Sequence, residues 1–153
     1  MRQRINPVEE LACEDPAAGL RDAFALLLPI RRQRLRRSER QQREHEQQLE
    51  RLQAEERAAA EQLTTRQSDY QTLRAGFAAA YLGHQPLSRL RRGLQQEGKA
   101  AEAVQRQRQT LRDSAAQCVA QGEQLAAARA ETQLRQRELE KLEMLMQENE
   151  VKP

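Results

Sequence analysis

The sequence has few of the large apolar side chains from which a compact core is built. Tryptophan is absent, two Phe and two Tyr are the aromatic residues of a 153-residue chain, and charged residues make up 32% of it. The mean hydropathy is -0.96. Because burial contributes only about 25 cal/mol per Å² of apolar surface, this composition argues against a large interior. Its richness in Ala, Glu, Leu and Arg favours long helices or a coiled coil.

Cysteine and histidine are also scarce. Cys13 and Cys118 lie far apart in the sequence and fit two free thiols, as is typical of a reducing compartment. Neither His45 nor His84 comes with the second group and the pocket that a general base needs. Glycine-rich phosphate loops are absent from the sequence. We therefore expect a protein that is not an enzyme, with no catalytic residues, no metal site and no cofactor.

Long hydrophobic runs are missing as well. A helix that crosses a bilayer needs about 20 apolar residues, whereas the apolar run from Ala23 to Leu28 is much shorter. Acidic residues precede this run, so it does not look like a secretory signal; they are Glu9, Glu10, Glu14 and Asp15. We expect a cytoplasmic protein without a direct membrane span, attached at most peripherally to a membrane machine through other proteins.

Proline divides the chain into two long stretches. Pro29 and Pro86 bracket 56 residues, and Pro86 and Pro153 bracket 66. Both stretches consist largely of strong helix formers. Between them, Gly83 suits a left-handed helix end and Pro86 suits a new helix start. The sequence therefore predicts an all-α fold, a long antiparallel two-helix coiled-coil hairpin, while a continuous helix that pairs with another chain stays open as the alternative.

The predicted boundaries follow from these breaks. Residues 1–28 form an extension that we expect to be flexible, with a possible short helix that starts at Asp15-Pro16. Residues 29–153 form the hairpin. Its parts are helix one at about 30–82, the turn at 83–86 and helix two at about 87–149.

A diluted heptad pattern runs along both predicted helices. In helix one, the positions expected at the helix contact are Leu35, Ser38, Gln42, His45, Leu49, Leu52, Glu56, Ala59, Leu63, Arg66, Tyr70, Leu73, Phe77 and Ala80. In helix two they are Leu87, Leu90, Leu94, Ala101, Val104, Leu111, Ala115, Cys118, Leu125, Ala128, Thr132, Leu139, Leu142 and Met146. Two successive steps of three near Leu125 predict a local overwinding. Gly122 falls on this pattern and would either let the helices approach or soften the pair.

The most distinctive feature is a block of seven arginines in thirteen residues, interrupted by one acid, Glu39. The block consists of Arg31, Arg32, Arg34, Arg36, Arg37, Arg40 and Arg43. It is either a basic helix face that aids solubility, or a binding surface for a protein with an acidic groove or ring, or a surface for nucleic acid or anionic lipid. Interleaved aromatics and a recognition motif are missing, so we expect no nucleic-acid partner.

The predicted hairpin tip has a different character. Four large side chains gather beside the turn: Phe77, Tyr81, Leu82 and Leu87. They either pack the end of the hairpin or form a surface that docks on a second partner, because aromatic and arginine side chains are favoured anchors in interfaces.

The run Leu27-Leu28-Pro29-Ile30-Arg31-Arg32-Gln33-Arg34-Leu35-Arg36-Arg37-Ser38-Glu39-Arg40 resembles the opening of the central-stalk proteins of type III secretion. These are small coiled-coil proteins of injectisomes (the YscO family) and of the flagellar export apparatus (the FliJ family). The rest of the chain is similar in size, hairpin layout and composition. The resemblance implies a rod that enters a hexameric secretion ATPase, contacts the cytoplasmic domain of the export gate and handles export chaperones.

By position, the resemblance places the seven arginines and the stretch near Leu139 to Met146 at the ATPase, and Phe77 and Tyr81 near the gate. The predicted function is thus a non-enzymatic stalk that couples the ATPase to the gate and promotes ATP hydrolysis and export. The rivals are a coiled-coil scaffold or chaperone-binding protein unrelated to an ATPase, and a basic helical module that binds nucleic acid.

Overall fold

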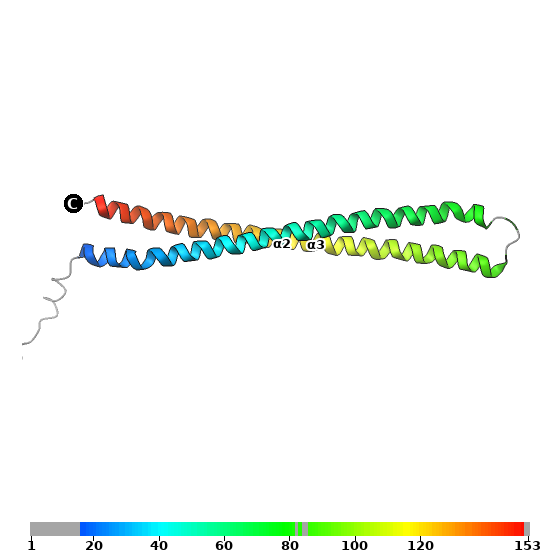
Figure 1. The fold of residues 1–153 in the computed structure, drawn as a ribbon, viewed down its shortest axis with the longest axis horizontal. Helices are drawn as coiled ribbons and strands as arrows, with labels where there is room; N and C mark the ends of the chain where they lie inside the picture. Colours follow the sequence, from blue (N-terminus) through cyan, green and yellow to red (C-terminus); the bar gives the residue numbers. More distant parts are fainter. Residues whose placement is uncertain (1–15, 82, 84–85, 152–153) are drawn as a thin grey trace, which may run out of the picture. The chain divides into compact units, whose positions relative to one another are not determined.

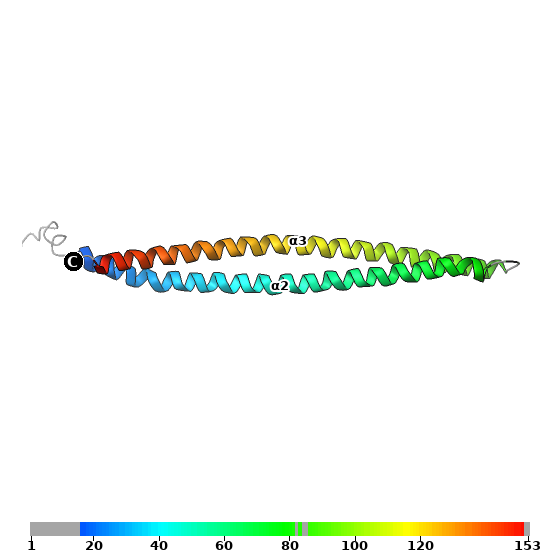
Figure 2. The same cartoon turned by 90° about the horizontal axis from the view of Figure 1, so that it is seen from above.

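The chain forms an all-α antiparallel coiled-coil hairpin in a computed structural model, which describes residues 16–81, 83 and 86–151. Helix α2 spans Pro16–Ala80 and helix α3 spans Leu87–Val151. The two helices lie side by side in both views (Figures 1 and 2). Contacts between the helices show that they are antiparallel. His45 of α2 contacts Gln121 of α3, and Ala59, further along α2, contacts Gln107, which is earlier in α3. The predicted fold class is confirmed.

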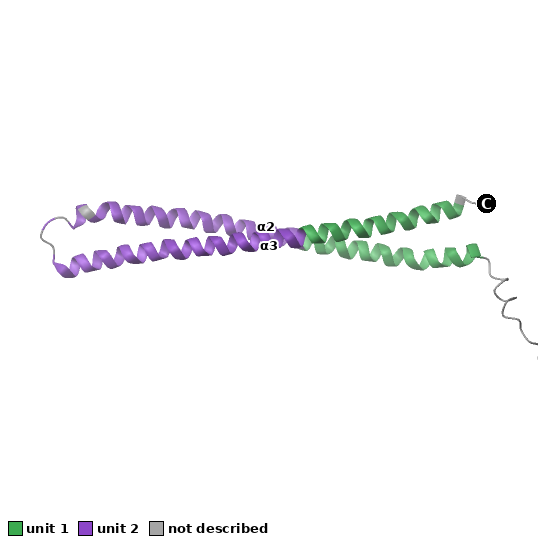
Figure 3. Ribbon diagram, turned by 180° about the vertical axis from the view of Figure 1, so that it is seen from behind, with its two compact units in different colours: residues 1–44, 126–153 green, residues 45–125 purple. Residues whose placement is uncertain are grey.

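The helix pair divides into two compact units (Figure 3). Unit 1 combines residues 1–44 with residues 126–153, and unit 2 comprises residues 45–125, including the connection between the helices. Each unit therefore contains one stretch of α2 and one stretch of α3. The basic block lies in unit 1, and the predicted tip lies in unit 2.

The contact face of α2 follows the predicted heptad register from Leu35 to Leu63. All nine predicted positions in this interval are buried or half-buried. Beyond Leu63 the prediction holds at Tyr70 and Phe77, which are half-buried. It is wrong at Arg66, Leu73 and Ala80, which are exposed, whereas Gln67 is half-buried in place of Arg66. A straight helix of about 3.6 residues per turn drifts away from a 3.5-residue repeat. Between Ala59 and Tyr70 the steps are four, four and three in place of the predicted four, three and four.

The contact face of α3 in unit 2 includes the predicted Leu90 but differs from the prediction on either side of it. Leu87 and Leu94 are exposed, and the positions turned toward α2 are Leu90, Gly93 and Glu97. The overwinding expected near Leu125 is also wrong. Gln121 is buried and continues the alternation of steps of three and four; the seam positions are 90, 93, 97, 100, 104, 107, 111, 114, 118, 121 and 125.

Apolar burial is sparse in both units, as the composition indicates. The most enclosed apolar side chains are Phe24 and Leu142 in unit 1, and Ala59, Val104 and Leu125 in unit 2. Two polar side chains are buried with them, Ser38 and Gln121. Polar groups in such positions need hydrogen-bond partners, and for Gln121 these partners are the ring and the carbonyl of His45.

Helix α2 starts much earlier than predicted and runs without interruption through Pro29. The expected start at about residue 30 is therefore wrong, and residues 16–28 belong to the long helix. Pro29 has no N–H, so the carbonyl of Ala25 loses its helical partner. Ala25 and Pro29 are both exposed, which lets water take the place of that bond. On the other side of the helix, Phe24 is buried and stabilises this first stretch.

The connection between the helices uses the predicted residues where they can be described. Gly83 has a φ of 92°, in the left-handed region that glycine adopts without strain. The carbonyl of Pro86 accepts hydrogen bonds from the amides of Arg89 and Leu90, so Pro86 opens α3 as expected. Helix α2 ends at Ala80, not at residue 82. None of the described helices has an apolar stretch long enough to cross a membrane.

Replacement of Pro29 by alanine restores a donor for the Ala25 carbonyl and removes the ring from the helix interior. We expect Pro29→Ala to raise the free energy of unfolding by about 1 to 3 kcal/mol, measured by urea unfolding followed by circular dichroism. Pro16→Ala is the matched control, because proline at the first position of a helix costs little. An unchanged or lower stability of Pro29→Ala would contradict a continuous helix through this residue.

Candidate functional site

The first arginine of the basic block has a contact that the sequence did not indicate. Arg31 is half-buried, and its Nη1 donates a hydrogen bond of 2.7 Å to the backbone carbonyl of Glu138. This bond joins α2 to α3 within unit 1. Charged donors form the stronger hydrogen bonds, so Arg31 contributes to the pairing of the helices. A further contact of Arg31 with a partner stays a prediction.

The other six arginines of the block face solvent. They are exposed, and within the described part of the chain they make no hydrogen bond or ion pair; they are Arg32, Arg34, Arg36, Arg37, Arg40 and Arg43. At about 100° per residue, they cover roughly 200° of the circumference of α2. Unit 1 thus presents positive charge in several directions around one helix.

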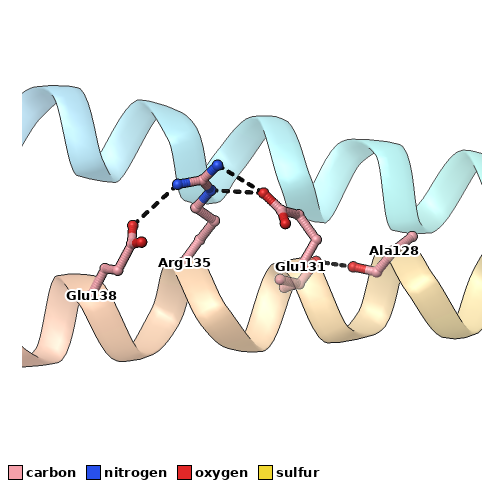
Figure 4. Close-up of polar contacts among 5 residues, drawn as sticks. Ala128, Glu131, Arg135 and Glu138 are labelled. Atoms are coloured by element: carbon pink, nitrogen blue, oxygen red, sulfur yellow. Dashed lines mark hydrogen bonds and ion pairs between the residues drawn. The ribbon is translucent and has the colours of Figure 1, made fainter.

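The stretch of α3 in unit 1 has more acidic than basic side chains. Residues 126–151 contain six acidic and four basic side chains. Arg135 donates to Glu131 at 2.9 Å and to Glu138 at 3.2 Å, and its Nη2 lies 2.8 Å from the Glu131 carboxylate (Figure 4). The hydrogen bond to Glu138 and then the charge of Glu131 raise the pKa of Arg135. Arg135 is therefore neutralised by its own helix, unlike the exposed arginines of α2.

The predicted tip residues Phe77 and Tyr81 lie together in unit 2. Their ring centroids are 4.8 Å apart, tilted by 40°, which is a favourable aromatic geometry. The guanidinium of Arg89 lies 6.0 Å from the centre of the Tyr81 ring, at the limit of a cation–π contact. Leu82 lies outside the described residues, and Leu87 is 62% exposed. The structure brings the two aromatics together for packing, while docking at the tip stays a prediction.

Gly93 explains how the Tyr81 ring fits against α3. A Cβ atom at Gly93 would overlap the ring of Tyr81, whereas a Cβ at Gly98 or Gly122 would meet nothing within 4 Å. The ring covers this glycine, which is why Gly93 is buried. The sequence pattern pointed to Gly122 as a place where the helices would approach, and it gave no sign of the close approach at Gly93. Gly122 does not mark a close approach.

A groove opens beside this packing. Its volume is about 260 Å³, and it is lined by Thr72, Leu73, Gly76, Phe77, Ala80, Tyr81, Gly93, Gln96 and Glu97. Glu97 is its one ionisable side chain apart from the Tyr81 phenol. General acid–base or nucleophilic chemistry needs a second reacting group in hydrogen-bond reach. This groove therefore has no arrangement for catalysis, although its apolar floor suits the side chain of a partner.

The remaining reactive side chains of unit 2 take part in the seam. His45 Nδ1 lies 2.9 Å from Gln121 Nε2, so the imidazole is used in helix pairing. Burial, followed by the hydrogen bond and the charge of Glu56, raises the pKa of the Cys118 thiol. A protonated thiol is a poor nucleophile and a poor metal ligand. Among the described residues, no group of three or more His, Cys, Asp or Glu side chains could hold a metal ion.

The comparisons with known proteins add no further constraint. No family model matches the chain, and neither the curated proteins nor the solved structures give a match. The functional interpretation therefore starts from the exposed arginines of unit 1 and the tip of unit 2.

The contact between Tyr81 and Gly93 gives a direct test of the tip. Gly98→Ala should raise the free energy of unfolding by about 1 kcal/mol, because alanine favours the helix and meets no neighbour. Gly93→Ala should instead lower it by about 1 kcal/mol, since the overlap with the ring outweighs the helical gain. Urea unfolding followed by circular dichroism measures both changes.

A double variant separates the gain in helix propensity from the cost of the overlap with the Tyr81 ring. In a Tyr81→Ala background the overlap is gone, so Gly93→Ala should become stabilising by about the same amount as Gly98→Ala. If Gly93→Ala stabilises the protein with Tyr81 in place, then the ring does not lie on Gly93 in solution.

Proposed function

We propose that the protein is a non-enzymatic stalk that couples a hexameric type III secretion ATPase to the export gate. The observation that carries the proposal is the set of six exposed arginines on α2 of unit 1 without an intramolecular partner. Charges that stabilise the fold would have acids beside them, as Arg135 has. Arginines that point around most of a helix suit a partner that surrounds it with carboxylates.

The mechanism rests on differential contact. A stalk shifts the equilibrium of a ring of subunits only if some subunit states bind it better than others. The arginines project from α2 at different angles, so each would contact a different subunit of the ATPase ring in a similar way. Subunit states that fit the arginines would be favoured, and ATP hydrolysis would rise. The stalk itself would hydrolyse nothing.

The tip would meet the second partner. Leu87 and Leu94, near the start of α3, are 62% and 52% exposed. Arg91 lies between them, one turn from each, and is exposed. Exposed apolar side chains with an arginine among them are typical of an interface. We assign this surface to the cytoplasmic domain of the export gate and, in the same pathway, to export chaperones. The protein would act in the cytoplasm, peripheral to the secretion apparatus at the inner membrane.

The proposal predicts a change in the ATPase rate. Purified chain should increase ATP hydrolysis by the hexameric ATPase of its own secretion system, measured by phosphate release. Replacement of the six exposed arginines by glutamate should abolish the increase, because attraction to acidic subunit surfaces becomes repulsion. The variant should keep its helicity, since these side chains support no contact in unit 1.

Four other exposed arginines of α2 provide the matched control: Arg51, Arg57, Arg66 and Arg74. Their replacement by glutamate should leave the increase in ATPase rate unchanged. No effect of the unmodified chain on the ATPase would favour a scaffold or chaperone-binding protein. Tight binding to nucleic acid that weakens steeply with salt would favour the basic nucleic-acid module.

A further inference from the structure

The outer face of α2 in unit 1 carries two exposed aliphatic side chains. Leu26 is 71% exposed and Ile30 is 45% exposed. They are four residues apart and therefore lie one above the other on the helix. The buried residues Phe24 and Ser38 mark the contact face of this stretch, and at about 100° per residue Leu26 and Ile30 point away from it.

The same row continues with positive charge. Arg34 and Arg37 follow Ile30 at steps of four and three, and both are exposed. We call Leu26, Ile30, Arg34 and Arg37 the mixed stripe. Arg36 and Arg40 lie beside it on the same half of the helix. Between residues 30 and 43 the sequence contains one acid, Glu39, so the stripe is apolar at its start and strongly basic over the rest of its length.

We propose that the mixed stripe docks on the surface of an anionic bilayer. Leu26 and Ile30 would enter the boundary between headgroups and acyl chains, and Arg34 and Arg37 would contact lipid phosphates. Helices that lie in this interface combine exposed aliphatic residues with arginines on one face. Arginine suits the position because its apolar stem can follow the buried face while the guanidinium reaches the headgroups. Anionic lipid attracts each such charge.

The aliphatic pair distinguishes a bilayer from nucleic acid. Phosphates of DNA or RNA would attract the same arginines, but they would leave Leu26 and Ile30 in water. A bilayer removes both side chains from water and gains from doing so. This inference goes beyond the proposed stalk. Arg34 and Arg37 also belong to the surface assigned to the ATPase, so the bilayer and the ATPase would compete for them. Leu26 and Ile30 do not belong to that surface, so a test on these two residues is independent of that assignment.

Sedimentation of the full chain with lipid vesicles tests the proposal. The chain should bind vesicles of phosphatidylcholine and phosphatidylglycerol in equal parts, should lose this binding in high salt, and should not bind pure phosphatidylcholine. Leu26→Gln with Ile30→Gln should weaken binding to the anionic vesicles by about tenfold or more, because the apolar area that leaves water is lost. Arg34→Gln with Arg37→Gln should weaken it by a similar factor.

The matched control uses an exposed apolar side chain of unit 2, Val119, which is 64% exposed. Val119→Gln removes a side chain of similar exposure and should leave vesicle binding unchanged. Circular dichroism should show equal helicity in all variants. Absence of binding to anionic vesicles would overturn the proposal. Full retention of vesicle binding by the Leu26/Ile30 variant would also overturn it. The same holds if duplex or single-stranded nucleic acid displaces the vesicles and binds the Leu26/Ile30 variant as tightly as the unmodified chain.

Discussion

The structure depends on side-chain donors of one helix that reach backbone carbonyl oxygens of the other. In unit 2, Gln107 donates to Ala59 and Gln121 donates to His45, and in unit 1 Arg31 donates to Glu138. Hydrophobic contact has no preferred direction, and these seams contain few large apolar side chains. Hydrogen bonds require a defined geometry, so they select which residues of α2 face which residues of α3. The antiparallel pairing in each unit follows from this selection.

A thin seam leaves most of the charged side chains in solvent, and their order along each helix decides what they do there. In α3, Glu131, Arg135 and Glu138 follow at steps of four and three, so opposite charges meet and form ion pairs on one helix face. In the basic block of α2, arginines take most of the corresponding steps, and Glu39 is the one acid among them. The same spacing rule thus gives paired charges in one case and a positive surface in the other. The proposed stalk and the proposed membrane contact both start from this difference.

The fold class, the connection near Gly83 and the start of α3 at Leu87 could be predicted from proline, glycine and helix propensity. The contact face of α2 could be predicted from Leu35 to Leu63, because the heptad rule holds while its drift is small. The passage of α2 through Pro29 could not be predicted, since it depends on the exposure of Ala25 to solvent and on the burial of Phe24. For the candidate site, the sequence identified the basic block, but not that Arg31 binds the Glu138 carbonyl. The role of Gly93 became visible only once Tyr81 was placed against it.

The antiparallel pairing of α2 and α3 within one chain is the central claim, and a distance between spin labels tests it most directly. Labels at Arg57 and Gln109 sit on exposed positions of unit 2, in a chain whose two native cysteines are replaced by serine. Helices in contact have axes about 8–10 Å apart, so with the label arms the account predicts a single distance of about 2–3 nm. This distance should persist when the labelled chain is diluted with unlabelled chain. A separation near 8 nm, as one continuous helix of about 1.5 Å per residue would give, or a short distance that disappears on dilution, would contradict the account.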